Sequence, residues 1–168
     1  WRRSGAAALL LHASPDILRV NLAEAEALLG MGANEQGVDS PGRDGRGARI
    51  SAARSLASRL STAVLLSGAE DIISDGERVA AVAGGSALMP FITGSGCMLS
   101  ALCGAFAAVE RDMYLAALYA ILYWKRCSEL AEIAAGGRGP GSLRQALMDA
   151  AYTVSDEVLA SAAQPEIL

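Results

Sequence analysis

The sequence predicts an α/β fold in a single domain, because two apolar runs alternate with segments of helical pattern. Residues 17–20 and 62–66 are short runs of apolar side chains that end at polar or glycine residues. Continuous apolar runs are typical of strands that helices cover on both faces. Neither an internal repeat nor a linker divides the chain. We therefore expect one domain over residues 1–168, with these two runs as neighbouring central strands that end at a binding crevice.

Composition and charge narrow the classes of partner. Hydrophobic residues make up 52% of the 168 residues and charged residues only 19%, which favours a compact core. A net charge of −4 provides no basic surface for nucleic acid, and no run reaches the roughly 18 apolar residues of a bilayer span. Three cysteines without a close pair favour a reducing compartment. We expect a cytoplasmic protein with no nucleic-acid or membrane partner, which binds small molecules or copies of itself.

The first part of the chain predicts a helix end at residues 6–11, the strand at 17–20 and a new helix from Asn21. The only histidine, His12, lies near a helix end, where an ordinary surface or capping role is expected. Glu24 follows Asn21 by three residues, which is the spacing of a capping box. A structural role for Glu24 is therefore the first interpretation of this pair.

A glycine-rich segment at residues 30–49 has no hydrophobic periodicity and is predicted to be a surface loop. Its arginines, Arg43, Arg46 and Arg49, are interpreted as solvated side chains, with phosphate contact as the alternative. Helical spacing then predicts a helix over residues 50–60.

Ser67 and Gly68 follow the second predicted strand, at the end where open α/β sheets bind their ligands. Residues 70–74 and 78–82 flank Asp75 and Gly76, a strong hairpin signal. We expect this hairpin to form the antiparallel edge of the sheet.

The sequence Thr-Gly-Ser-Gly-Cys at residues 93–97 joins an apolar run to a helix predicted over residues 97–109. Backbone N–H groups at a helix N-terminus lack intrahelical partners and carry a partial positive charge, so Gly94, Ser95, Gly96 and Cys97 suit a phosphate. The alternative is a tight strand-to-helix turn with a buried Cys97. As a thiol in a first helical turn, Cys97 suits a nucleophile, a base or merely a small residue.

The last third of the chain is predicted to be helical. Residues 113–134 form a long helix whose aromatic side chains suit the core or a subunit contact. The turn at residues 139–142 leads into another helix with Ser142 as its N-cap, and residues 149–163 are largely helical. Because the first half of the long helix is apolar on several sides, we expect an oligomer.

Four segments, in this order, resemble motifs of the hydroxyethylthiazole kinases, a family of the ribokinase-like superfamily. Residues 19–24 (RVNLAE) are similar to its Arg-Gly-Asn-Ala-x-Glu segment, and residues 66–71 (LSGAED) to its Thr-Gly-x-x-Asp segment. Residues 92–99 (ITGSGCML) with 104–109 (GAFAAV), and the turn 139–142 (GPGS), complete the set. The resemblance covers about residues 2–158.

This resemblance implies a ribokinase-like three-layer sandwich with a mostly parallel central sheet, lacking the N-terminal strands of the family. It implies transfer of the ATP γ-phosphoryl group to the hydroxyl of hydroxyethyl-methylthiazole in thiamin salvage, with ATP and Mg²⁺ bound. The resemblance also implies roles for single residues: Cys97 is catalytic and Glu24 belongs to the metal site. The residues implied to bind the nucleotide are Arg19, Ser67, Gly94, Ser95 and Gly96. A homotrimer with active sites between subunits is also implied.

Two substitutions and one absence depart from the family pattern. Val20 replaces a glycine and adds bulk near the expected phosphate site, whereas Ser67 replaces a threonine and keeps the hydroxyl. The early strands and an upstream Asp-Pro-Val-Gly segment have no counterpart. Two functions follow: a thiazole kinase that needs an N-terminal segment or a partner chain, or a non-catalytic relative that serves as an assembly subunit.

Overall fold

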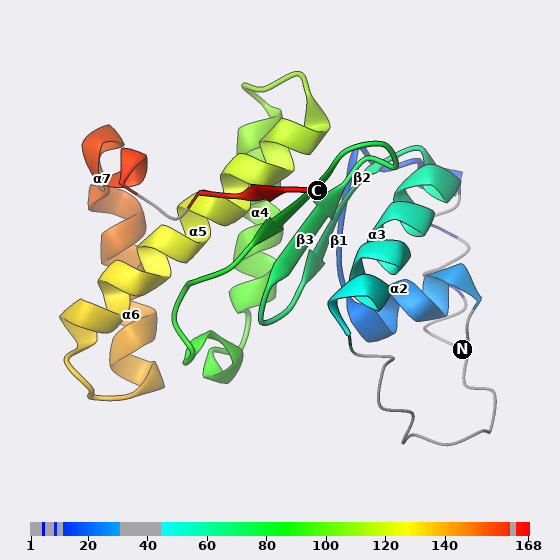
Figure 1. The fold of residues 1–168 in the computed structure, drawn as a ribbon. Coiled ribbons are helices and arrows are strands. Elements are labelled where there is room, and N and C mark those ends of the chain that lie inside the picture. The colour runs from blue at the N-terminus through cyan, green and yellow to red at the C-terminus, as the bar shows by residue number, and fades with distance from the viewer. Residues whose placement is uncertain (1–4, 6–8, 10–11, 31–44, 162–163) are drawn as a thin grey trace, which may run out of the picture.

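The computed structural model describes residues 5, 9, 12–30, 45–161 and 164–168. Most of the helix end expected at residues 6–11 lies outside these residues, as does Arg43. The described chain forms a twisted sheet with helices on both of its faces (Figure 1).

The sheet has five strands in the order β1-β2-β3-β4-β5. Strands β1 (Ile17–Asn21) and β2 (Ala63–Ser67) pair in parallel, with Asn21 opposite Ser67. Strands β3 (Asp71–Ser74), β4 (Val79–Val82) and β5 (Glu166–Ile167) add three antiparallel pairings. The predicted pairing of the two apolar runs is confirmed.

Three details of the predicted sheet are corrected. The sheet is mixed rather than mostly parallel, and β1 lies at the edge of the described sheet rather than at its centre. The hairpin is not the other edge, because β5 pairs with β4. A two-residue strand so distant along the chain gives no hydrophobic pattern that could have revealed this pairing.

Helices cover the two faces with separate apolar cores, as a three-layer sandwich requires. Helices α2 (Leu22–Leu29) and α3 (Arg46–Leu60) pack on the face that carries Val64 and Leu66. Helices α4 (Ser95–Ala107) and α5 (Met113–Ala135) pack on the face that carries Leu65. Helix α6 (Pro140–Thr153) packs on α5 and adds to the same core. Successive residues of β2 thus point to opposite layers.

Helix α3 begins at Arg46, four residues earlier than predicted, so Arg46 and Arg49 belong to a helix and not to a loop. Arginine and alanine are good helix formers, and tertiary contacts favour the early start. Arg46 forms ion pairs with Glu70 and with Glu166. The glycines at this boundary obscured the helix in the sequence.

The segment before the glycine turn is also not a strand. It is a single 3₁₀ turn, η1 (Met89–Phe91), with proline in its first turn. Pro90 lacks a backbone N–H and suits the start of a helical turn better than the interior of a sheet.

Helix α5 is confirmed, and its own chain covers most of its apolar surface. Tyr114 and Trp124 are buried, whereas Tyr119 is 42% exposed. The expectation of an oligomer, which rests on the apolar sides of this helix, is therefore supported only by the exposed part around Tyr119.

The C-terminal helices differ from the prediction at their boundaries. Gly139, not Ser142, is the N-cap of α6, because the fixed φ of Pro140 suits the first helical position. The helical stretch breaks between α6 and α7 (Asp156–Ala160).

Candidate functional site

Arg19 and Ser67, predicted to contact a nucleotide, lie together at the carboxyl ends of β1 and β2. The Arg19 guanidinium donates from NH1 to Ser67 Oγ at 3.2 Å and from Nε to Ser100 Oγ at 3.0 Å. Ser67 Oγ donates in turn to the carbonyl of Val20 at 3.2 Å. Two hydroxyls and the neighbouring strand thus fix the direction of the guanidinium, as a binding site for a charged ligand requires.

The glycine turn comes next to this arginine. Gly94 has φ of +91° and is the N-cap of α4, a backbone conformation that glycine adopts without strain. A Cβ on Gly96 would lie 3.1 Å from the Arg19 Cζ, so Gly96 lets the arginine approach the helix. The two glycines therefore serve different needs, the first for its backbone angle and the second for its missing side chain.

Backbone N–H groups at the start of α4 are available in part. Both donors of Ser95 are used within the turn: its N–H bonds to Ile92 O at 3.1 Å, and its hydroxyl to Met89 O at 3.3 Å. Within the described residues, the N–H groups of Gly96 and Cys97 donate no hydrogen bond. The helix dipole adds partial positive charge at these two amides, beside Arg19.

Cys97 is exposed in the first turn of α4, so the alternative of a buried cysteine at this position is wrong. The other two thiols, Cys103 and Cys127, are buried. Burial raises the pKa of Cys103 to about 11 and also raises the pKa of Cys127. Exposure therefore distinguishes Cys97 from the inert thiols of the core.

Glu24 forms the capping box that its spacing predicts. Asn21 Oδ1 accepts the Glu24 N–H, and Glu24 Oε2 accepts the Asn21 N–H, both at 2.9 Å.

No cluster of three or more acidic, histidine or cysteine side chains suited to a metal occurs in the described part of the chain. Mg²⁺ commonly takes one or two carboxylates and completes its shell with waters and phosphates. One exposed carboxylate therefore fits a shared magnesium but not a cage built from protein ligands.

Sequence analysis missed three residues that support this region. Ser100, one helical turn after Gly96, holds Arg19 and donates to Gly96 O at 3.1 Å. Asp71 accepts the Gly68 N–H at 2.9 Å and forms an ion pair of 2.7 Å with Lys125, and both side chains are buried. Helical spacing from Gly96 could have revealed Ser100, whereas nothing local reveals Lys125.

Lys125 also donates to the carbonyl of Gly84 at 2.9 Å. One side chain of α5 therefore ties the turn after β2 to the segment after β4, which leads to the glycine turn. These contacts hold the two parts of the candidate site at a fixed separation.

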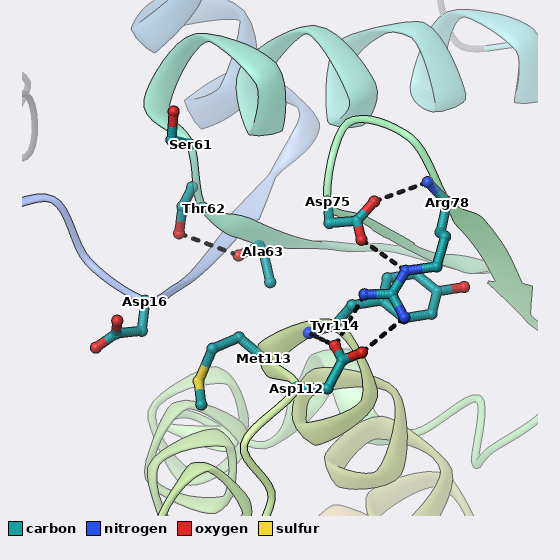
Figure 2. A pocket seen from close by; sticks show the side chains of 9 residues that line it. All are labelled: Asp16, Ser61, Thr62, Ala63, Asp75, Arg78, Asp112, Met113 and Tyr114. Carbon is teal, nitrogen blue, oxygen red and sulfur yellow. Dashed lines mark hydrogen bonds and ion pairs between the residues drawn. The ribbon is translucent and has the colours of Figure 1, made fainter.

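A pocket of about 220 Å³ lies at the opposite, amino-terminal ends of β1 and β2 (Figure 2). Asp16 and Ala63 line it, together with Arg78, which Asp75 holds at 2.6 Å and Asp112 at 2.7 Å. The hydrogen bond from Arg78 is the largest influence on Asp112 and lowers its pKa. Burial opposes ionisation of Asp75, but hydrogen bonds from Arg78 and the backbone outweigh it and lower that pKa as well. This arginine is neutralised, so the pocket lacks the free cation that the predicted site has.

Comparison with known proteins agrees with the resemblance. The model of the hydroxyethylthiazole kinase family matches residues 1–157. A hydroxyethylthiazole kinase of Listeria monocytogenes (strain F2365) is 41% identical over 157 residues, and one of Clostridium botulinum (strain Alaska E43) is 35% identical over 162. The alignments cover 94% and 95% of this chain but only 58% of each relative.

A solved hydroxyethylthiazole kinase structure from Pyrococcus horikoshii has a TM-score of 0.84 and 29% identity, over 99% of this chain and 60% of that one. This likeness confirms the ribokinase-like α/β class. No helix in the described ranges is long and apolar enough to cross a membrane. On the family match and the shared fold, the chain belongs to the hydroxyethylthiazole kinase family.

Proposed function

We propose that this chain provides the nucleotide-binding part of a hydroxyethylthiazole kinase. The enzyme would transfer the γ-phosphoryl group of ATP to the hydroxyethyl group of hydroxyethyl-methylthiazole, a step of thiamin salvage. The observation that carries the proposal is the position of Arg19, fixed by Ser67 and Ser100 beside the unpaired amides of Gly96 and Cys97. A rigid cation and aligned N–H donors at the carboxyl ends of strands are suited to phosphate oxygens.

Phosphoryl transfer needs positioning and charge stabilisation more than covalent chemistry by the protein. In the proposed arrangement, Arg19 and Ser67 bind ATP phosphate oxygens, and Gly94 lies beside the nucleotide. The amides of Gly96 and Cys97 face the transferred phosphoryl group, where negative charge develops. Ser95 supports the turn through its bonds to Ile92 and Met89.

Cys97 stands where most ribokinase-like enzymes carry an aspartate base, according to the family resemblance. Its exposure in the first turn of α4 leaves the thiol accessible to an alcohol substrate. We propose that Cys97 lies against the attacking hydroxyl. Glu24 would orient Mg²⁺ or its waters, and the ion would supply charge neutralisation for the phosphates.

The chain spans about 58% of the length of the curated relatives it matches. We propose that a segment outside these 168 residues, in the same polypeptide or in a partner chain, completes the thiazole pocket. The second candidate is a non-catalytic subunit that keeps the family fold for assembly.

A homotrimer is also proposed. The open part of α5 supports a subunit contact: Tyr119 lines an apolar groove of about 290 Å³ with Phe106, Leu122 and Leu159. Light scattering at micromolar concentration gives the test. A single species near 17.2 kDa with a well-folded spectrum would exclude this assembly.

Product formation tests the activity. The chain is incubated with MgATP and hydroxyethyl-methylthiazole, and the phosphate ester is followed by ³¹P NMR. Arg19→Ala should weaken ATP binding about tenfold, because a charge-assisted bond to phosphate is lost. Arg59→Ala is the matched control, since Arg59 lies on α3 and bonds only to the carbonyl of Leu29 among the described residues.

The outcomes separate the two candidates. Product that forms when a chain carrying the rest of the family fold is added, and falls with Cys97→Ala, supports the kinase. ATP binding without product, unchanged when a chain carrying the rest of the family fold is added, supports the assembly subunit. Absence of ATP binding refutes the nucleotide site itself.

A further inference from the structure

Arg49 of α3 lies against the turn that follows β2. Its NH2 group donates to the carbonyl of Glu70 at 2.9 Å. A Cβ built on Gly68 would lie 2.7 Å from the Arg49 Cζ, so the guanidinium occupies the space that a side chain at Gly68 would take. Arg49 therefore contacts the residue that follows Ser67, and the hydroxyl of Ser67 accepts a hydrogen bond from Arg19.

The two arginines approach this turn from opposite layers. Leu65 faces the α4–α5 core and Leu66 faces the α2–α3 core, so Ser67 continues the first face and Gly68 the second. Arg19 meets Ser67 and the α4 residue Ser100, whereas Arg49 comes from α3. The carboxyl end of β2 therefore lies between two guanidinium groups.

Neither cation is neutralised by a carboxylate within the described residues. Arg46, Arg78, Lys125 and Arg126 all form ion pairs there, but Arg19 and Arg49 form none. Arg49 bonds to the backbone carbonyl of Glu70, whereas the Glu70 carboxylate forms its ion pair with Arg46 at 2.9 Å. Arg49 thus donates one N–H to a carbonyl, and its positive charge is available to an anionic ligand.

We propose that Arg49 is a second phosphate-binding residue, which reaches a polyphosphate at the end of β2 from the layer opposite to Arg19. The proposal rests on the nucleotide site proposed above and adds a ligand to it. Arginine suits this role because its planar fork binds phosphate oxygens with several donors at once. Two unpaired cations also raise the local concentration of an anionic ligand in a crevice.

Isothermal titration of the 168-residue chain with MgATP, adenosine and inorganic tripolyphosphate tests the proposal. Arg49→Gln keeps a donor for the Glu70 carbonyl but removes the charge. We expect about tenfold weaker binding of MgATP and tripolyphosphate, with adenosine affinity unchanged. Arg49→Lys keeps the cation but loses the planar fork, so we expect an intermediate loss of MgATP and tripolyphosphate binding, about threefold.

Arg54→Gln is the matched control, because Arg54 lies on the same helix and bonds to a backbone carbonyl, that of Glu77, at 3.4 Å. It should leave all three affinities unchanged. Equal losses for adenosine and tripolyphosphate in Arg49→Gln would show a structural role and overturn the proposal, as would no loss at all. If Arg49→Gln does not fold, Arg49→Lys decides instead: unchanged tripolyphosphate binding, or an equal loss of adenosine binding, overturns the proposal.

The same titrations separate this proposal from the function on which it rests. A wild-type chain that binds neither MgATP nor tripolyphosphate refutes both. A wild-type chain whose binding depends on Arg19 but not on Arg49 refutes only the role of Arg49.

Discussion

Replacing Lys125 by Met tests whether the buried ion pair with Asp71 holds the two parts of the candidate site together. The two side chains are 10% and 7% exposed, and Nζ lies 2.7 Å from Asp71 Oδ2. Methionine has nearly the volume of the lysine stem, so the change removes the charge with little cavity. Asp71 would keep only the Gly68 N–H as a partner among the described groups.

The expected cost follows from this burial. Removing one partner of a buried pair leaves an uncompensated charge, which typically costs about 3–5 kcal/mol. Because Asp71 keeps one N–H donor and a small exposure, we expect the lower end, about 3 kcal/mol. The lost bond to the Gly84 carbonyl is part of this figure, since both contacts belong to one side chain.

Urea unfolding followed by circular dichroism measures the free energy of unfolding. The neighbouring Arg126→Met is the control: its pair with Glu129 is 3.2 Å long, with side chains 23% and 30% exposed, and should cost under about 1 kcal/mol. The double variant Lys125→Met with Asp71→Asn should lose less than the sum of the single changes. A cost for Lys125→Met below about 1 kcal/mol, with an unchanged m-value, would refute the reasoning and indicate that water solvates the pair.

Three further outcomes are expected. A thiol reagent at pH 8 should modify only Cys97 in the folded chain, and all three cysteines in denaturant, because the others are buried with raised pKa values (Cys103 and Cys127); modification of more than one folded thiol would contradict this. Asp112→Asn keeps the N-cap acceptor of α5 but loses the negative charge and the Oδ2 acceptor that Arg78 uses, for a cost of roughly 0.5 kcal/mol at pH 7 after allowance for solvent screening. Since the pKa of Asp112 is lowered by folding, its contribution is present above the unfolded pKa of about 3.9 and disappears as pH falls through the folded value, so wild type and variant should converge at low pH in urea titrations. Gly76→Ala should cost roughly 1–3 kcal/mol in thermal unfolding, because φ is +102° and its Cβ would lie 2.7 Å from Ser58 Oγ; an unchanged midpoint would show that the turn rearranges freely.

Local patterns predicted the elements whose causes are local. The hairpin at Asp75 and Gly76 and the capping box of Asn21 and Glu24 each depend on residues within a few positions of one another. The apolar runs that form β1 and β2 are local patterns too, although the two strands pair with each other at long range. Sequence analysis was correct there because propensity, pattern and tertiary structure agree.

Features that depend on distant partners could not be predicted in this way. The start of α3 at Arg46 is supported by Glu70 and Glu166, neither of which a local pattern connects to it. Arg49 and Lys125 contact the turn after β2, through Glu70 and Asp71, and these contacts form only in the folded chain. Their roles require coordinates, because no spacing along the chain encodes them.

The pairing of β5 with β4 has a consequence for the order of folding. Val79 accepts a hydrogen bond from Leu168, and Ala80 pairs with Ile167. This edge of the sheet therefore cannot form until α4, α5, α6 and α7 have been synthesised. Contacts between such distant residues form late, because the intervening loop must first be ordered. During synthesis the nascent hairpin therefore presents an open row of peptide groups to other chains. Until Ile167 and Leu168 are in place, β4 therefore remains an unpaired strand edge that can pair with another chain.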